Sequence, residues 1–230
     1  MSTRPMVQLT IDGQRVEVVE GTTIHEAARS LGVSIPVLCH DPRLEPVGVC
    51  RLCVVDIGQR TLAAACLRPC EQDMVVVTDN EEVRGHRAML TRLLLSEQPE
   101  HSAREATSGD DALLALAREQ GIAEVGLPDG AVGEPRGKDL SSPVIAVDHQ
   151  ACILCDRCIR GCDEIQHNDV ITRTGRGYQT RIAFDLDVAM GESSCVSCGE
   201  CVAVCPTGAL THRILSTLSP EAETPRSGGR

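Results

Sequence analysis

The stretches CILCDRCIRGC (residues 152–162) and CVSCGECVAVC (residues 195–205) each place four cysteines at the spacing C-x2-C-x2-C-x3-C. Each cysteine of the second stretch lies 43 residues after its counterpart in the first, so the two stretches form an internal repeat. Pro206 follows the second stretch, whereas Asp163 follows the first. Eight cysteines repeated at identical spacing are not a product of composition, and they decide how the C-terminal part of the chain folds.

This spacing is typical of bacterial ferredoxins with two [4Fe–4S] clusters, in which the fourth cysteine of each run binds the other run's cluster. We therefore expect one [4Fe–4S] cluster on Cys152, Cys155, Cys158 and Cys205. We expect the second [4Fe–4S] cluster on Cys195, Cys198, Cys201 and Cys162. Three glycines in or near the runs are expected to let the backbone approach the clusters closely: Gly161, Gly199 and Gly208. Zinc sites use C-x2-C pairs separated by a long gap, so zinc is the less favoured alternative.

The segment between the two runs, residues 163–194, is longer than a minimal ferredoxin needs. Within it, ITRTGRGYQTRIAFD (residues 171–185) predicts a β-hairpin. The only two aromatic residues of the chain, Tyr178 and Phe184, lie in this hairpin. We expect both to pack locally within the insert.

The N-terminal part of the chain carries the pattern of a second small domain. Residues 7–19 (VQLTIDGQRVEVV) alternate around Asp12-Gly13, which predicts a hairpin with a type I′ turn. A helix is expected next, with a capping box of Thr23 and Glu26 and a C-terminal Gly32. Strand-like runs follow at 53–57, 61–65 and 74–77. The order β-β-α-β-β-β predicts a β-grasp domain over residues 1–78.

Four cysteines of this domain are separated by gaps of 10, 2 and 12 residues: Cys39, Cys50, Cys53 and Cys66. Plant-type [2Fe–2S] sites share the central C-x2-C and the distant fourth cysteine, although their first gap is shorter. We therefore expect a [2Fe–2S] cluster on these four residues, with Gly48 shaping the loop around it. Zinc remains an alternative on spacing alone.

Two neighbours of this predicted site are ambiguous. Cys70 competes with Cys66 as the fourth ligand; we prefer Cys66 because TLAAAC (residues 61–66) continues an apolar strand into the site, which leaves Cys70 as a free thiol. His40 either bonds to the cluster environment or is a solvated loop histidine, and we favour the second interpretation.

Composition excludes several classes of protein. The chain has 230 residues and 13 cysteines, and an odd number of cysteines cannot all pair within one chain. The net charge of −11 argues against nucleic-acid binding, which needs a basic surface. The sequence contains no run of 18 apolar residues, so it predicts no membrane span. It also does not begin with the apolar region of a signal peptide. We therefore expect a reducing, cytoplasmic compartment, where spaced cysteines bind metal.

Between the two cysteine-rich parts, residues 79–141 form a predicted helical scaffold and linker. Helices are expected at 79–96 and 110–120, the first with a stripe of Val83, Met89, Leu90, Leu93 and Leu94. Residues 122–142 are rich in glycine and proline and predict a linker. The second ferredoxin domain is expected at 142–213 and a flexible tail at 214–230. The predicted fold class is α+β.

SIPVLCHDPRLEPVGVCRLCVVDI (34–57), AAACLRP (63–69), ACILCDRCIRGCDEI (151–165) and SCVSCGECVAVCPTGAL (194–210) are the motifs of a known family. The chain resembles the N-terminal iron–sulfur region of the large iron–sulfur subunit of respiratory complex I over about residues 7–212. The same module occurs in NAD-reducing hydrogenases, electron-bifurcating hydrogenases and NAD-dependent formate dehydrogenases. In length the chain is closest to the small diaphorase (gamma-type) subunit of NAD-reducing hydrogenases.

The resemblance implies a non-catalytic electron-transfer subunit with one [2Fe–2S] and two [4Fe–4S] clusters. Its partners would be a flavin- and NADH-binding diaphorase subunit and a catalytic hydrogenase or formate dehydrogenase subunit. No catalytic constellation and no glycine-rich nucleotide fingerprint stand out in the sequence.

One departure from the family concerns a third site between the two domains. The family normally binds another [4Fe–4S] cluster there through one histidine and three cysteines. The equivalent stretch, LLLSEQPEHSAREATSGDDALLALAREQG (93–121), has His101 but no cysteine. We expect this cluster to be absent and only its helical scaffold to remain. Either the other clusters then lie closer together or a partner's cluster fills the gap.

Three other functions stay open at this point. The first is the iron–sulfur subunit of a succinate dehydrogenase or fumarate reductase, which would carry a modified second set of cysteines. The second is a zinc-stabilised interaction scaffold, and the third is a ferredoxin that acts alone.

Overall fold

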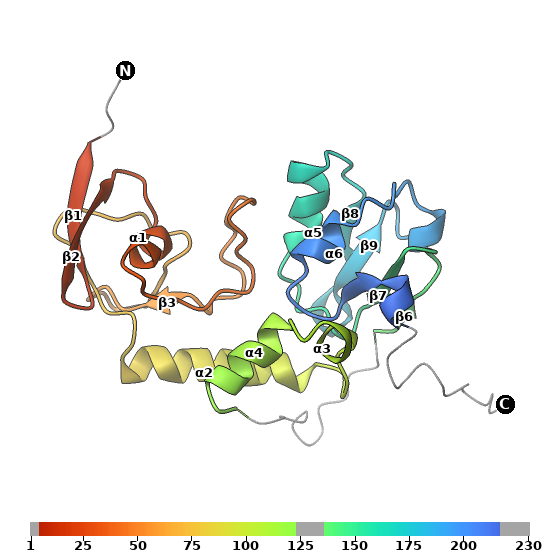
Figure 1. Ribbon diagram of the computed structural model, residues 1–230, viewed down its shortest axis with the longest axis horizontal. Coiled ribbons are helices and arrows are strands. Elements are labelled where there is room, and N and C mark those ends of the chain that lie inside the picture. Colours follow the sequence, from red (N-terminus) through yellow and green to blue (C-terminus); the bar gives the residue numbers. More distant parts are fainter. Residues whose placement is uncertain (1–4, 123–135, 217–230) are drawn as a thin grey trace. The chain divides into compact units, whose positions relative to one another are not determined.

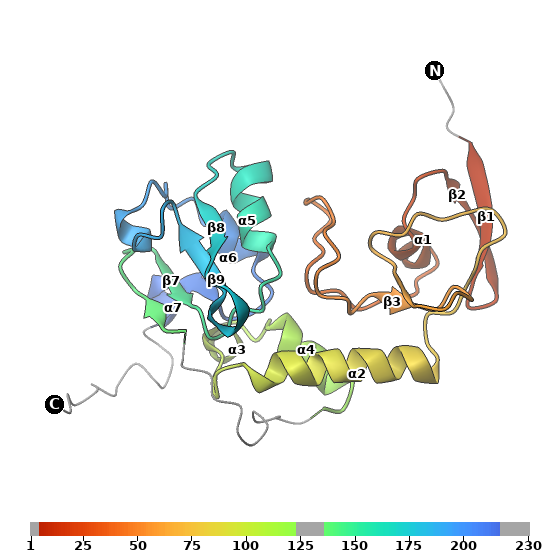
Figure 2. The ribbon, with the colours of Figure 1, turned by 180° about the vertical axis from the view of Figure 1, so that it is seen from behind.

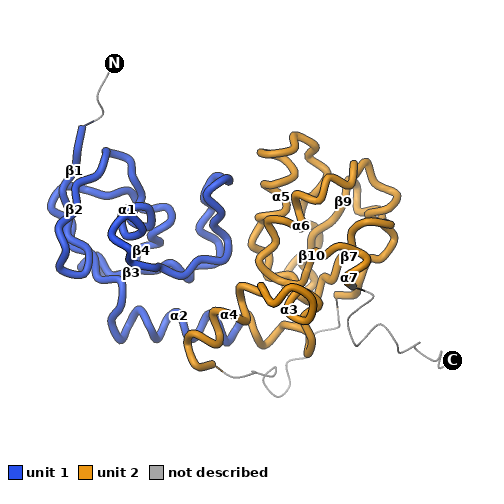
Figure 3. The backbone as a smooth tube through the Cα atoms, viewed as in Figure 1, with its two compact units in different colours: residues 1–93 blue, residues 94–230 orange. Residues whose placement is uncertain are grey.

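A computed structural model describes residues 5–122 and 136–216. The chain divides into two compact units, Met1–Leu93 and Leu94–Arg230, which Figure 3 draws in different colours. It passes from one unit to the other inside a single helix, α2 (Glu81–Ser96). Each unit has its own hydrophobic core.

The sheet of unit 1 is built on the predicted hairpin. Strands β1 (Met6–Ile11) and β2 (Gln14–Val19) pair antiparallel along their full length. Asp12 and Gly13 between them have φ values of 48° and 80°, the left-handed pair that a type I′ turn requires. Figure 1 shows β1 and β2 side by side. Strand β5 (Val75–Val76) pairs parallel with β1, which gives the order β2-β1-β5. The hairpin prediction is confirmed.

Helix α1 (Ile24–Ser30) carries the predicted capping box. The Glu26 amide donates to Thr23 Oγ1 at 3.2 Å, and the Thr23 amide donates to Glu26 Oε2 at 2.9 Å. The helix ends before Gly32, whose φ is 76°, also as predicted. Its buried face packs with the inner face of the sheet into one core that includes Leu9, Ile11, Ile24, Ala27, Ala28 and Val76.

The middle strands are shorter than the predicted runs at 53–57 and 61–65. Strands β3 (Val54–Val55) and β4 (Ala63–Ala64) form a separate two-stranded ribbon. A single bridge from Asp56 to Val77 connects this ribbon with the end of β5. The cysteines lie just outside the strands, because a loop rather than a ladder can turn several thiols toward one point.

Helix α2 begins after Asn80, whose side chain accepts the amide of Val83 at 2.9 Å. The predicted stripe is wrong in part, because Met89 and Leu93 are 57% and 56% exposed. The buried residues follow a different line at intervals of four: Val83, Arg87, Thr91 and Leu95. Two of these are polar, so hydrophobic periodicity alone pointed to the wrong phase of the helix.

Unit 2 opens with two more capped helices. Helix α4 (Ala112–Glu119) confirms the prediction at 110–120, and Asp111 caps it by accepting the amides of Leu113 and Leu114 at 3.1 Å each. The short helix α3 (Ala103–Thr107), capped by Ser102, was not predicted.

The C-terminal sheet has the order β10-β7-β6 and is antiparallel: β6 (Lys138–Asp139), β7 (Ile145–Asp148) and β10 (Leu210–His212). The predicted hairpin of the insert is present as β8 (Ile171–Thr174) and β9 (Arg181–Phe184). Four short helices complete the cysteine-rich part: α5 (Arg157–Arg160), the π-helix Gly161–Ile165, α6 (Glu200–Val204) and α7 (Arg213–Ser216). Single 3-10 turns lie at Gly177–Gln179 and Met190–Glu192. Helix α7 contacts β7 (Figure 2).

Two predictions about the rest of this unit change. Strand β6 lies inside the predicted linker 122–142, and α7 includes residues assigned to the predicted tail. The remaining parts of both predictions, residues 123–135 and 217–230, lie outside the described residues.

The core of unit 2 contains cysteines as members. Cys152, Cys158, Cys162, Cys201 and Cys205 are buried in it beside aliphatic side chains of β7 and β10. Phe184 is 2% exposed and packs in this same core, so it is not confined to the insert as expected. None of the described helices is both long and apolar enough to cross a membrane.

Candidate iron–sulfur centres

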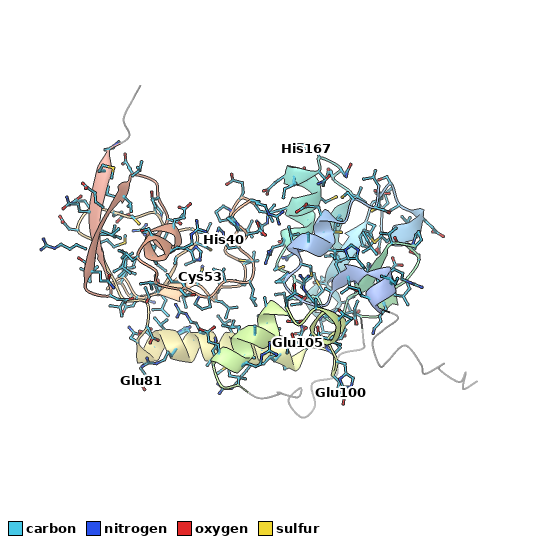
Figure 4. The ribbon with its side chains drawn as sticks, viewed as in Figure 1. His40, Cys53, Glu81, Glu100, Glu105 and His167 are labelled. Atoms are coloured by element: carbon cyan, nitrogen blue, oxygen red, sulfur yellow. The ribbon has the colours of Figure 1, made fainter. Side chains whose placement is uncertain are left out.

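The four N-terminal cysteines predicted as ligands come together in unit 1. The sulfurs of Cys53 and Cys66 lie 3.3 Å apart, although 13 residues separate them in the chain. The Cys39 sulfur hydrogen-bonds to the thiols of Cys50 and Cys66. Cys53 precedes β3 and Cys66 follows β4, so the pairing of Val54 with Ala64 sets these two thiols side by side. Cys53 is labelled in Figure 4.

Hydrogen bonds among these four thiols shift their pKa values in opposite directions. The thiol of Cys50 lowers the pKa of Cys39 to about 2, and the thiol of Cys66 lowers the pKa of Cys53 to about 7. The same contacts raise the pKa of Cys50 and of Cys66. Thiolates are the form that binds iron, and the close contacts among these four thiols bring them within reach of one cluster.

The loop before Cys50 needs glycine at one position. Gly48 has a φ of 63°, and a Cβ there would overlap Cδ1 of Leu67. The turn lets the amides of Val49 and Cys50 donate toward the Cys39 sulfur. Backbone amides directed at ligand sulfurs are a common way of tuning cluster potentials.

Cys70 lies apart from the four. Its thiol is 4% exposed and packs in the core of unit 1, and its amide donates to the Thr22 carbonyl at 2.8 Å. Burial, with a smaller contribution from Glu26, raises its pKa to about 11. The structure thus brings Cys66, and not Cys70, to the other three thiols.

His40 is not the solvated loop histidine that the sequence favoured. It is half-buried, and its ring packs edge-on against His25 with centroids 4.9 Å apart. Burial, followed by the charge of His40, lowers the pKa of His25. Figure 4 labels His40 on its loop.

In unit 2 the eight remaining predicted ligands fall into two groups, and each group takes its fourth member from the other run. The first group is Cys152, Cys155, Cys158 and Cys205, each only 7–8% exposed. Burial raises the pKa of the other three, and the proximity of Cys205 adds to the effect in each case, although at least 47 residues of sequence separate it from them.

The second group is Cys162, Cys195, Cys198 and Cys201, all of which line one small pocket. Apolar side chains complete its wall, including Ile145, Val170 and Ile171. Cys198 is exposed and Cys195 half-buried, so this group lies nearer the protein surface than the first.

Burial is the main cause of the raised pKa values in both groups. It raises the pKa of Cys152 to about 11 and of Cys201 to about 12, and the neighbouring cysteine thiolates add to the effect. Several buried thiolates repel one another unless a cation compensates them. Four thiols gathered around one point in an apolar core therefore fit an iron–sulfur cluster, which brings that positive charge.

The backbone repeats as the sequence does. Leu154 and Ser197 occupy equivalent positions and have φ values of 53° and 56°. Asp156 and Gly199 are also equivalent, with φ values of 61° and 81°. The C-x2-C-x2-C spacing therefore corresponds to one local conformation with two left-handed residues, which wraps three thiols around the same space.

The two runs end differently because of the residue after the last cysteine. Pro206 has no amide hydrogen and keeps Cys205 extended, at φ −67° and ψ 126°, so helix α6 ends there. Asp163 permits the helical turn to continue, and a π-helix carries the chain on to Ile165. The departure noted in the sequence thus has a local structural consequence and leaves the grouping of the thiols intact.

Two of the glycines expected near the clusters are also required by packing within unit 2. A Cβ on Gly161 would lie 3.1 Å from Cγ2 of Val204, and one on Gly208 would lie 2.9 Å from Oγ of Ser102. These two glycines make room for a neighbouring helix and for the start of α3. Gly199 is required by its positive φ.

Residues 93–121, where the family's third cluster site is expected to be missing, contain the helices α3 and α4. His101 is exposed, while Leu113, Leu116 and Ala117 are buried. The amide of Ala112 donates to the Pro206 carbonyl at 2.8 Å, which fixes the start of α4 against the second cysteine run. A single-ion site of three or more His, Cys, Asp or Glu side chains is not found among the residues described.

Sequence reasoning missed two arginines that contact the cysteine-bearing segments. Arg87 donates to the carbonyls on either side of Cys53, and Arg104 donates to the carbonyl of Cys205. Arg87 had one signal in the sequence, since it stands four residues from Val83 and from Thr91 on the same face of a helix. Arg104 had none.

Comparison with protein families gives two matches. Residues 4–81 match the 2Fe-2S iron-sulfur cluster binding domain. Residues 142–211 match the ferredoxin-like domain of NADH-quinone oxidoreductase subunit 3. A [2Fe–2S] ferredoxin domain followed by a second ferredoxin-like domain is therefore established.

Similarity to individual proteins covers most of the chain, including the residues between the two matched domains. The sequence is 38% identical over 214 residues to the NADP-reducing hydrogenase subunit HndD of Solidesulfovibrio fructosivorans, a match that covers 90% of this chain and 36% of that protein. It is 34% identical over 212 residues to a subunit of an NADH-quinone oxidoreductase from Rhizobium meliloti, covering 89% and 24%. The chain thus spans about a third or less of the length of these relatives.

The similarity to solved structures also extends over most of the chain. A chain of an NAD+-reducing [NiFe]-hydrogenase in the H2-reduced state superposes with a TM-score of 0.80 at 30% identity. The match covers 90% of the present chain and 87% of that one. The similarity therefore includes the helices between the two ferredoxin domains as well as the domains themselves.

Proposed function

The chain belongs to the family of iron–sulfur electron-transfer subunits of NAD(P)-linked hydrogenases, formate dehydrogenases and NADH-quinone oxidoreductases, and from this we propose that it relays electrons within such a complex. One partner would be a flavin- and NADH-binding diaphorase subunit. The other would be a catalytic hydrogenase or formate dehydrogenase subunit. The observation that carries the proposal is the gathering of twelve cysteines into three groups of four, one in unit 1 and two in unit 2.

We assign the cofactors to these groups. A [2Fe–2S] cluster would be held by Cys39, Cys50, Cys53 and Cys66. Two [4Fe–4S] clusters would be held by Cys152, Cys155, Cys158 and Cys205, and by Cys162, Cys195, Cys198 and Cys201. When bound, such clusters supply one-electron transfer at potentials set by net charge, hydrogen bonding and exposure.

The chain's own residues would bind, orient and shield these groups. The buried thiols bind the metal, the left-handed loop residues hold three of them at one point, and the aliphatic core excludes water. With four cysteines per cluster no iron position remains open for a substrate, so the proposed role is transfer and not catalysis. Because cysteines that bind metal are typical of a reducing compartment, we retain a cytoplasmic location as part of the proposal.

Iron, sulfide and zinc analysis of the full chain purified under anaerobic conditions, together with EPR, tests the proposal. One [2Fe–2S] and two [4Fe–4S] clusters give about ten iron atoms per chain. About fourteen would show that a third [4Fe–4S] cluster exists despite the missing cysteines. A colourless protein with bound zinc would establish the scaffold alternative and refute the proposal.

A partner is tested separately. Co-purification of the chain with a flavin-containing subunit from its native source is the expected result. Isolation of the chain alone, with all its clusters and no flavoprotein, would instead identify a ferredoxin that acts by itself.

A further inference from the structure

The helical segment 81–119 contains no cysteine, yet it contributes one arginine to each of two cysteine-bearing segments. Both side chains approach backbone carbonyls beside a proposed cluster ligand. These contacts bridge long stretches of sequence, so they belong to the tertiary structure.

In unit 1 the arginine is Arg87, on helix α2. Its Nε donates to the Leu52 carbonyl at 3.1 Å, and its Nη2 donates to the Val54 carbonyl at 2.8 Å. The guanidinium therefore spans the residue between these two, Cys53. Arg87 is only 9% exposed, so this contact is made inside the protein.

In unit 2 the arginine is Arg104, on helix α3. Its Nη1 donates to the Cys205 carbonyl at 2.7 Å and to the Val202 carbonyl at 3.2 Å. The other edge of the guanidinium binds Asp110 at 2.8 Å. The arginine side chain is 17% exposed and that of Asp110 is 53% exposed, so the cation lies deeper than its partner.

Each guanidinium can act in two ways. Its hydrogen bonds hold the peptide groups next to a ligand cysteine, and the direction of the thiol follows from those peptide groups. Its positive charge lies in a poorly hydrated place, where electrostatic effects are stronger than in water. Reduction adds one negative charge to a cluster, so a nearby buried cation favours the reduced form.

We propose that Arg87 and Arg104 are positioning residues that hold Cys53 and Cys205, respectively, and raise the reduction potential of the cluster bound at each. This inference rests on the proposed function, because it presumes clusters at both sites. In this proposal the helical segment 81–119 is part of the [2Fe–2S] site at Cys53 and of the [4Fe–4S] site at Cys205, and not only a spacer between them.

EPR-monitored redox titration of the full chain tests the inference with crossed variants. Arg87→Gln should shift the [2Fe–2S] midpoint potential to a more negative value and leave both [4Fe–4S] potentials unchanged. Arg104→Gln should shift one [4Fe–4S] potential in the same direction and leave the [2Fe–2S] potential unchanged. Each variant thereby serves as a control for the other.

Two matched arginines on the same segment control for loss of surface charge. Arg84 is 63% exposed and pairs with Asp79 at 3.0 Å, and Arg118 is 57% exposed and pairs with Glu105 at 2.6 Å. Arg84→Gln and Arg118→Gln should leave all three potentials at their wild-type values. Equal shifts in these controls would overturn the inference.

Further variants keep the inference falsifiable if a glutamine variant does not fold. Asp110→Asn removes the exposed partner of Arg104, and it should shift the same [4Fe–4S] potential to a more positive value. Arg87→Lys keeps the charge but cannot donate to both carbonyls in the same planar geometry, so it should alter the [2Fe–2S] line shape. A wild-type [4Fe–4S] potential in Asp110→Asn would overturn the role of Arg104. A wild-type [2Fe–2S] line shape in Arg87→Lys would overturn that of Arg87.

The same measurements distinguish a failure of the proposed function from a failure of this inference. A wild-type chain without iron–sulfur EPR signals would refute the proposed function itself. Wild-type signals with unchanged potentials in Arg87→Gln and Arg104→Gln would refute only the roles of these two arginines.

Discussion

At the scale of single residues, the choice between Cys66 and Cys70 depended on the tertiary structure. Both cysteines follow the same strand-like run, and only four positions separate them. Cys66 and Cys70 are both buried in the core of unit 1, but it is the Cys66 sulfur that contacts the thiols of Cys53 and Cys39. An isolated β-bridge between Thr23 and Pro69 fixes the position of the chain between Cys66 and Cys70.

This difference predicts opposite results for two substitutions. Cys70→Ala should keep the full [2Fe–2S] EPR intensity and lower the free energy of unfolding by about 1 kcal/mol, because it removes only a buried sulfur. Cys66→Ser should abolish the [2Fe–2S] signal. Spin quantitation and urea unfolding measure both effects.

Alkylation provides a control for the same assignment. Because burial holds the pKa of Cys70 at about 11, its thiol should react with iodoacetamide at neutral pH only after unfolding. A Cys70→Ala protein without the [2Fe–2S] signal would show that Cys70, and not Cys66, is the fourth ligand.

At the scale of elements, helix α2 shows where pattern-based reasoning fails. The leucines and methionine of this helix suggested one face, but the side chains that meet the rest of the protein are Val83, Arg87, Thr91 and Leu95. Arg87 lies on the buried face because two backbone carbonyls accept its hydrogen bonds there. Buried polar groups are stable when they are hydrogen-bonded, so the buried face of a helix need not be apolar.

The phase of α2 can be tested by substitutions on its two faces. Val83→Ala should lower the free energy of unfolding by about 2 kcal/mol, because Val83 is fully buried. Met89→Gln and Leu93→Gln should each change it by less than about 0.5 kcal/mol, as expected for exposed positions. Urea unfolding of the full chain measures all three.

The comparison has a clear failing outcome. If Met89→Gln is as destabilising as Val83→Ala, the helix packs through the face that its hydrophobic residues suggested.

At the scale of the whole molecule, the chain consists of two units with separate cores. All four cysteines of the proposed [2Fe–2S] site belong to unit 1, and all eight of the proposed [4Fe–4S] sites belong to unit 2. No cysteine group draws members from both units, so damage to one centre should stay within its unit.

Cys201→Ser tests this independence. It should remove or alter one [4Fe–4S] EPR signal and leave the line shape and intensity of the [2Fe–2S] signal unchanged. Leu186→Ala is the matched control, since Leu186 is 95% exposed in the same unit and should affect neither cluster. Loss of the [2Fe–2S] signal in Cys201→Ser would mean that the two units fold interdependently.

The sequence by itself determined the local features of this protein. These features each depend on residues that lie close together in the chain: the spacing of the cysteines, the Asp12-Gly13 turn, and the capping box of Thr23 with Glu26. Such short-range patterns can be recognised in a sequence because local backbone geometry determines them. The assignment of Cys162 and Cys205 to each other's clusters also comes from the sequence, because the repeat identifies a known motif, and it stays a prediction.

Only the tertiary structure decided the contacts that join distant segments. Arg87 meets carbonyls more than 30 residues away and Arg104 meets one 101 residues away, and nothing near either arginine in the chain specifies its acceptor. The same holds for the buried place of Cys70, for the packing of Phe184 in the main core and for the two glycines that admit a helix. Such contacts depend on which buried groups lack a partner once the elements have packed, and that is a property of the assembled fold.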